Sequence, residues 1–166
     1  QDHNPDSTLL ESYQAYTDYR HVMEMVETMV YEVSMQVLGT PSIVHRGVTL
    51  DFTPPWQRLS LLEEIYNRTG LNIHDYPDDD SLSAIINSLG VTVDGPASRG
   101  RLLDKLVSTV VEPHLVQPTF LFDYPVEMCP LAKQKQDDPA VAERFEELRF
   151  RTCQYSRSQC LNNSWC

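Results

Sequence analysis

The spacing of apolar residues changes within the first third of the chain, and this change indicates a fold that mixes helices and strands. Across residues 22–37 the apolar side chains recur every three or four positions, and Gly39 follows them. This spacing puts them on one side of a helix, and glycine is typical just beyond a helix end. Across residues 43–52, on either side of Arg46 and Gly47, apolar and polar residues alternate, which predicts a β-hairpin.

Five further elements are predicted beyond the hairpin. Ser60 followed three positions later by Glu63 is a capping box, which is typical of the first turn of a helix. Asp138 before Pro139 predicts another helix, because proline is tolerated at the first helical position. A dense apolar run between two prolines predicts a mostly buried strand. The expected elements are helices at 60–70, 80–90 and 98–110, a strand at 119–123 and a helix from 139. We therefore expect one α+β domain.

The length and composition are those of an ordinary globular domain. The chain of 166 residues is long enough for one domain with a real core. No apolar run approaches the roughly 20 residues that cross a bilayer, and no leader pattern is recognisable, so we expect an intracellular, cytoplasmic protein. A net charge of −11 should repel phosphate backbones, which argues against a broad nucleic-acid-binding surface.

The four cysteines do not form a pattern that predicts a metal site. Cys129 stands alone, and Cys153, Cys160 and Cys166 fall in the last fourteen residues. Structural zinc sites usually draw on closely spaced cysteine pairs, and such pairs are absent from the sequence. We therefore expect unpaired thiols of the kind found in cytosolic proteins.

The first residues contain the chemistry that is most suggestive of a ligand. If residues 7–13 are extended, then Leu9, Glu11 and Tyr13 point to the same side. A carboxylate beside a phenol suits a cationic ligand, because the first supplies charge and the second a directional hydrogen bond. The alternative is an exposed strand edge with both groups in water. Similarly, the charged residues at 143–147 are expected to form a solvated face.

Eight blocks of the sequence together form a longer pattern. They are His3–Asp6, Leu10–Tyr19, Asp51–Arg58, Arg101–Leu106, Gln117–Phe120, Asp123–Glu127, Cys129–Lys133 and Glu143–Glu146. In this order, over about residues 2–148, they resemble the class II lysyl-tRNA synthetases, and the first two are similar to the second half of that family's motif 2 with its E-x-Y-x-A-Y-x-D-Y run. Aspartyl- and asparaginyl-tRNA synthetases share the class, but the Pro-Leu-Ala-Lys block and the Ala-Tyr-Thr-Asp-Tyr run favour the lysyl branch.

The resemblance implies a reaction and assigns residues to it. The family activates lysine with ATP to lysyl-adenylate and transfers it to tRNA-Lys, as a homodimer, on an antiparallel sheet flanked by helices. Glu11 and Tyr13 match positions that bind lysine, His3 matches a residue beside the ATP phosphates, and Glu146 matches a carboxylate that holds Mg²⁺ with ATP. Two alternatives are a paralogue that modifies a protein lysine and a truncated synthetase-like binding or regulatory module.

The chain also departs from the family pattern. We expect residues 1–148 to form part of the catalytic core, from the second half of motif 2 onward, with the rest of motif 2 belonging before residue 1. Ser7 stands where the family has a phenylalanine that stacks on adenine. Residues 149–166 form a divergent tail, in which Cys153, Ser156 and Cys160 fall at the family's remaining metal and lysine ligands. A shifted reading frame or altered splice near residue 147 would explain the tail, and the 166 residues alone are expected to be inactive.

Overall fold

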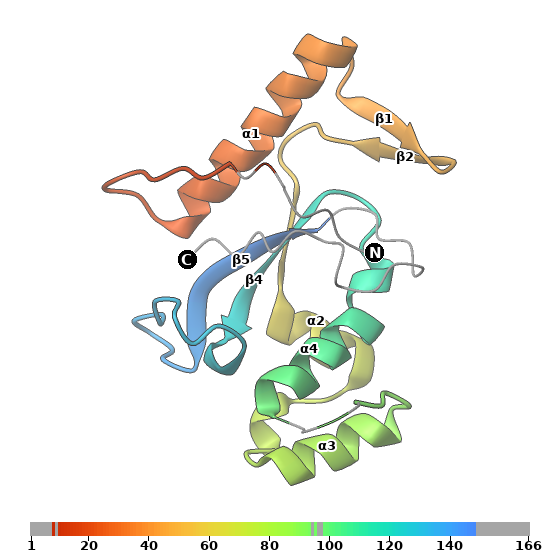
Figure 1. Ribbon diagram of the computed structural model, residues 1–166, viewed down its shortest axis with the longest axis vertical. Helices are drawn as coiled ribbons and strands as arrows, with labels where there is room; N and C mark the ends of the chain where they lie inside the picture. The colour runs from red at the N-terminus through yellow and green to blue at the C-terminus, as the bar shows by residue number, and fades with distance from the viewer. Residues whose placement is uncertain (1–7, 9, 94, 96–97, 149–166) are drawn as a thin grey trace.

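The computed structural model describes residue 8, residues 10–93, residue 95 and residues 98–148, and it confirms the α+β class (Figure 1). Within these residues, no helix is both long and apolar enough to span a membrane. Short 3₁₀ turns lie at Ile73–Asp75, Glu112–His114 and Val126–Met128. The helices are α1 Tyr19–Leu38, α2 Leu61–Thr69, α3 Asp79–Ser88 and α4 Arg99–Val110, and the strands are β1 Ser42–His45, β2 Val48–Asp51, β3 Gln57–Ser60, β4 Thr119–Pro125 and β5 Val141–Leu148.

The long helix and the hairpin form where the sequence predicts them. The Asp18 side chain caps α1 by accepting a hydrogen bond from the backbone N–H of His21 at 3.0 Å. Gly39 ends the helix with a φ of 71°, a left-handed conformation that glycine adopts without steric cost. β1 and β2 then pair antiparallel, and Arg46 and Gly47 make the turn with φ values of 49° and 81°. Local signals are therefore sufficient to specify this part of the fold.

The main sheet has three strands in the order β3-β4-β5. β3 and β4 run parallel, with Gln57 opposite Thr119, because α2, α3 and α4 are inserted between them along the chain. β4 and β5 run antiparallel, with Leu121 opposite Glu146. The antiparallel pairing expected from the family resemblance is thus present between β4 and β5.

The helix predicted from residue 139 is wrong, because this segment is β5. Asp138 does act locally, since its side chain accepts from the N–H of Ala140 at 3.2 Å, but it closes a turn. Val141 and Phe145 are then buried against β4, and strand pairing outweighs the cap-like signal. The charged residues of β5 are consequently half-buried, so the prediction of a solvated face at 143–147 is also wrong.

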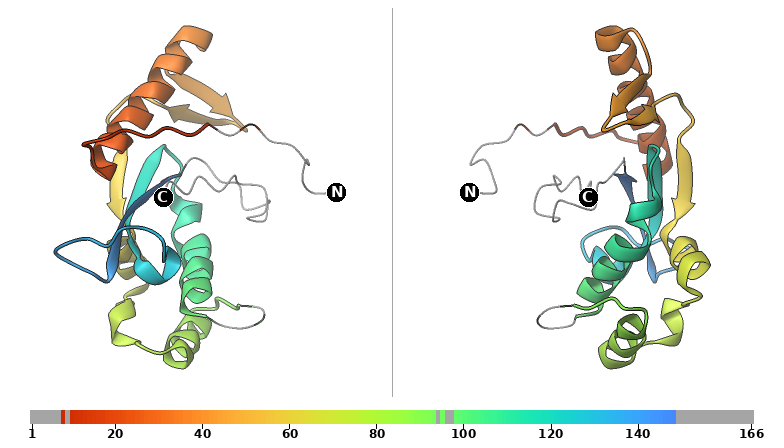
Figure 2. Two further views of the ribbon diagram at one scale, coloured as in Figure 1. Left: turned by 60° about the vertical axis from the view of Figure 1, so that its left-hand side comes forward. Right: turned by 90° about the vertical axis from the view of Figure 1, so that its right-hand side faces the viewer.

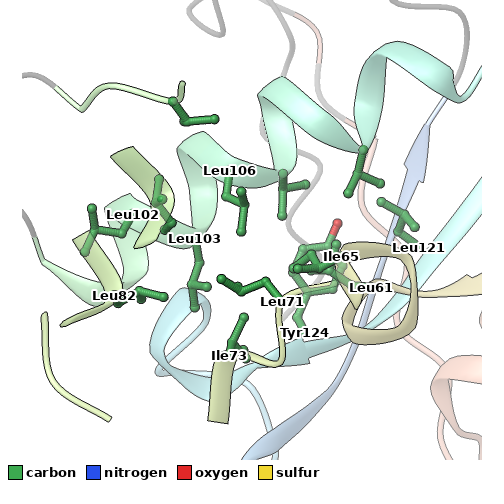
Figure 3. Close-up of a cluster of buried hydrophobic side chains, with 14 of the residues drawn as sticks. Leu61, Ile65, Leu71, Ile73, Leu82, Leu102, Leu103, Leu106, Leu121 and Tyr124 are labelled. Carbon is green, nitrogen blue, oxygen red and sulfur yellow. The ribbon is translucent and has the colours of Figure 1, made fainter. Parts of the chain in front are cut away.

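Neighbouring residues of β4 belong to two different buried clusters. Leu121 packs with α2, α3 and α4, in the cluster that Figure 3 shows. Phe120 belongs to the second cluster, with α1 and the hairpin. Because successive strand residues face opposite ways, the sheet separates the two cores. Figure 2 shows the corresponding arrangement, with α1 and the hairpin at one end of the molecule and α3 at the other.

A buried carboxylate joins α1 to the beginning of the sheet. Glu27 lies in the middle of α1 with only 5% of its surface exposed. Its Oε2 accepts from the backbone N–H of Trp56 at 2.8 Å, and its Oε1 pairs with Nη2 of Arg58 at 3.0 Å. The Trp56 ring stacks on Phe120 with the ring centroids 5.2 Å apart. One side chain therefore fixes the helix, the strand β3 and the aromatic core relative to one another.

We predict that Glu27→Ala lowers the free energy of unfolding by about 2–4 kcal/mol, because it leaves the buried Trp56 N–H and Arg58 without their acceptor. Glu24→Ala is the matched control, since Glu24 is exposed on the same helix, and should cost less than about 0.5 kcal/mol. Urea unfolding followed by circular dichroism measures both. Equal losses in the two variants would contradict this role of Glu27.

Candidate functional site

The carboxylate and phenol predicted to bind lysine are in contact. The Tyr13 hydroxyl donates to Oε2 of Glu11 over 3.3 Å, and Tyr13 is 88% exposed. Residues 10–14 belong to no helix or strand, so the extended strand considered above is not assigned there, yet the two side chains do lie on one side. The pair offers a negative charge and a hydroxyl to solvent, immediately before the turn that leads into α1.

Several other residues named by the family resemblance lie outside the described residues. These are His3, which was matched to the ATP phosphates, and Ser7, which was matched to the adenine-stacking position. Cys153, Ser156 and Cys160 in the tail lie outside them as well. The candidate site therefore consists of the Glu11–Tyr13 pair and the surroundings of Glu146.

Glu146 lies on β5 as part of a compact polar triad with Arg144 and Tyr124. Its Oε1 forms an ion pair with Nη2 of Arg144, two positions earlier on the strand. The Arg144 guanidinium lies over the Tyr124 ring, 5.0 Å from the centroid, and the Glu146 carboxylate is close enough to the Tyr124 phenol to raise its pKa. Tyr124 is 2% exposed, whereas the Glu146 side chain is 31% exposed. The carboxylate is thus the member of the triad that reaches solvent.

Burial keeps the Tyr124 phenol protonated. Loss of solvent raises its pKa well above the ordinary value of 10.0, and the negative charge of Glu146 raises it further. Buried Glu112, the first residue of the 3₁₀ turn after α4, acts in the same direction, while Arg144 opposes both carboxylates. At neutral pH the phenol is therefore uncharged and does not compete with Glu146 as a second anion.

A break in the alternation of β4 brings Tyr124 to this position. Asp123 has a φ of 60°, and the register with β5 shifts between Phe122 and Tyr124. As a result, Tyr124 shares a buried cluster with Leu121, although residues three apart on a regular strand face opposite ways. Lys135 holds Asp123 through an ion pair of 3.0 Å, which also raises the pKa of the lysine. Tyr124 could not be assigned to this site from the sequence, because regular strand alternation would place its side chain on the opposite face of β4.

Arg144 was also missed as a site residue, although the sequence contains a signal for it. Once 141–148 is recognised as a strand, residues two apart share a side, so Arg144 and Glu146 must lie together. Because the pattern at Asp138 predicts a helix and not a strand, the sequence did not indicate that Arg144 and Glu146 share a side. The structure therefore brings Glu146 together with two residues to which the sequence assigned no role.

The donor set fits a magnesium ion that is delivered with a nucleotide better than a free ion. The described residues contain no group of three or more His, Cys, Asp or Glu side chains that could hold a metal. Mg²⁺ usually keeps several waters and is bound by one or two carboxylates together with substrate phosphates. Glu146 can supply one such carboxylate. Its charge is already balanced by Arg144, so phosphate oxygens must contribute most of the attraction.

Comparison with known proteins identifies the family. The sequence model described as "tRNA synthetases class II (D, K and N)" matches residues 1–152. The chain belongs to this family. In keeping with that membership, lysine-tRNA ligases of Dehalococcoides mccartyi and Chloroflexus aurantiacus are each 46% identical to it, over 146 and 144 residues. The lysine-tRNA ligase of Moorella thermoacetica is 42% identical over 144 residues.

The similarity covers most of this synthetase chain but a minor part of its relatives. The three alignments include 88%, 87% and 87% of the chain, and each includes 29% of the relative. The chain thus spans less than a third of the length of the curated relatives it matches. The fold described above is accordingly a partial class II synthetase catalytic domain.

We predict that Asp123→Val destabilises this synthetase domain by about 1–3 kcal/mol, because a β-branched residue is strained at positive φ and cannot pair with Lys135. Asp123→Asn is the control, since asparagine tolerates the left-handed region and keeps a hydrogen-bonding side chain. Thermal unfolding compares the two variants. If Asp123→Val were as stable as Asp123→Asn, the left-handed Asp123 would not be a constraint on β4.

Proposed function

We propose that this chain is part of the catalytic domain of a cytoplasmic lysine-tRNA ligase. In this proposal, residues 1–148 supply portions of the lysine and ATP sites, and residues 149–166 are a divergent tail. The whole reaction is the ATP-dependent activation of lysine to lysyl-adenylate, followed by transfer to tRNA-Lys. The names of the three relatives support this substrate, and the contact between Glu11 and Tyr13 is the single structural observation that carries it.

The Glu11–Tyr13 pair suits the side-chain ammonium of lysine. An ammonium has three donors and one charge, so it can pair with the carboxylate while a phenol oxygen accepts a second hydrogen bond. An exposed ion pair contributes only about 0–1 kcal/mol in water. Because Tyr13 is 88% exposed, we expect the 166 residues alone to bind lysine weakly, with a Kd of about 1 mM or more.

Glu146 and His3 are proposed to act at the nucleotide. A magnesium ion bound with ATP would neutralise phosphate charge, and Glu146 would supply one protein oxygen to it. His3 would lie beside the phosphates. No side-chain nucleophile is required, because the lysine carboxylate itself attacks the α-phosphate and displaces pyrophosphate, and the protein only positions and stabilises the reactants.

We predict that the 166 residues alone do not catalyse lysine-dependent exchange of pyrophosphate into ATP. The reason is that Cys153 stands at the position of the family's second metal-binding glutamate, and a thiol is a poor ligand for Mg²⁺. The exchange is measured with labelled pyrophosphate, with a full-length lysine-tRNA ligase as the positive control. Exchange that depends on added lysine would contradict the prediction.

We predict that lysine perturbs the amide NMR signals of residues near Glu11 and Tyr13 at millimolar concentration, and that Glu11→Gln and Tyr13→Phe weaken this effect about threefold or more. Norleucine, which keeps the α-amino group but lacks the side-chain ammonium, is the ligand control, and Glu32→Gln on the exposed face of α1 is the protein control. Equal perturbation by norleucine, or an undiminished response in Glu11→Gln, would refute the assignment of this pair to lysine.

A further inference from the structure

Arg144 links the three members of the triad through two direct contacts. Its guanidinium pairs with the Glu146 carboxylate and lies over the Tyr124 ring at 5.0 Å. A guanidinium held by both partners orients the carboxylate more firmly than a single ion pair does, because the ring restricts the rotamers of Arg144.

The three side chains of the triad are exposed to solvent to different extents. Tyr124 is 2% exposed, the Arg144 side chain 12% and the Glu146 side chain 31%. A glutamate side chain without such contacts rotates freely about its bonds. A ligand that binds it is then held less tightly, because binding costs the conformational entropy of that side chain. Here the Tyr124 ring and the Arg144 guanidinium are mostly buried, and they support the Glu146 carboxylate, which is the most exposed of the three groups.

From this arrangement we propose that Tyr124 and Arg144 are positioning residues, which hold the Glu146 carboxylate in the orientation that receives the metal ion of a bound nucleotide. This inference rests on the proposed function, since it takes Glu146 to be the magnesium-binding carboxylate. Within the triad, the resemblance to the synthetases assigns a role only to Glu146, and the two residues that hold it are identified by their contacts. Both act through Glu146, so they are positioning residues and not catalytic residues.

The balanced charge of the triad adds a second expectation. Because Arg144 neutralises Glu146, the triad has little attraction for a free divalent ion, but it does not exclude an ion that is already coordinated by phosphates. The metal is therefore expected to bind with ATP and not before it. Mn²⁺ is a suitable probe, since it takes the oxygen ligands that Mg²⁺ uses and broadens nearby NMR signals.

The first measurement tests the contacts without any metal. In the chain labelled at glutamate Cδ, the Glu146 signal is expected to shift in Tyr124→Leu, which removes the ring that the guanidinium lies over, and in Arg144→Lys, which keeps the charge but removes the planar fork. Glu143→Gln is the matched control, because Glu143 lies on the same strand and pairs with Lys133 at 2.8 Å. A Glu146 signal that is unmoved in both test variants would overturn the proposal. Circular dichroism confirms that each variant is folded.

The second measurement adds Mn²⁺ with ATP. Amide signals of residues 144–146 are expected to broaden with Mn²⁺-ATP and not with Mn²⁺ alone, and the concentration required should rise about fivefold or more in Tyr124→Leu and Arg144→Lys. The Glu143→Gln control should behave as wild type.

Broadening that is equal in wild type and in both test variants overturns the positioning role and leaves the proposed function intact. No broadening in wild type overturns the nucleotide role of Glu146 itself, and with it the positioning role. The two failures are therefore distinguishable.

Discussion

The arrangement of this domain depends on one buried carboxylate, that of Glu27. A carboxylate taken out of water is costly unless its oxygens are hydrogen-bonded, and Glu27 meets this condition only where Trp56 and Arg58 both reach it. The interaction therefore selects a single placement of α1 against the sheet. The same placement brings the Trp56 ring against Phe120, which in turn meets Phe145 edge-on with the centroids 5.3 Å apart. One polar requirement thus sets the geometry of an apolar core.

This constraint extends to both parts of the candidate site. The Glu11–Tyr13 segment leads through a short turn into the Asp18 cap of α1, so the position of the segment depends on the position of the helix. On the other side, Phe145 lies next to Glu146 on β5. The aromatic core thereby fixes the strand on one face, while the Glu146 carboxylate extends from the opposite face. The pair proposed to bind lysine is thus attached to α1, and the carboxylate proposed to act at the nucleotide lies on β5, which packs against the same core.

The sequence predicts the local elements well because they are encoded by neighbouring residues. The Asp18 cap, the stop at Gly39 and the turn at Arg46 and Gly47 all act within a few positions of one another. β5 was misread because its identity depends on pairing with β4, more than fifteen residues away, and the local Asp138 signal points to a helix. The contacts of Tyr124 could not be foreseen for a related reason. They require the left-handed Asp123, which is stabilised by Lys135 from a separate loop.

Glu11 and Tyr13 are proposed to form one side of a lysine site within a class II synthetase fold, and a crystal structure of the chain grown with excess lysine would show this contact. In such crystals we expect the side-chain ammonium of lysine about 3 Å from both the Glu11 carboxylate and the Tyr13 hydroxyl. Lysine bound elsewhere, or a Glu11 and Tyr13 pair that remains closed on itself in saturated crystals, would contradict the claim.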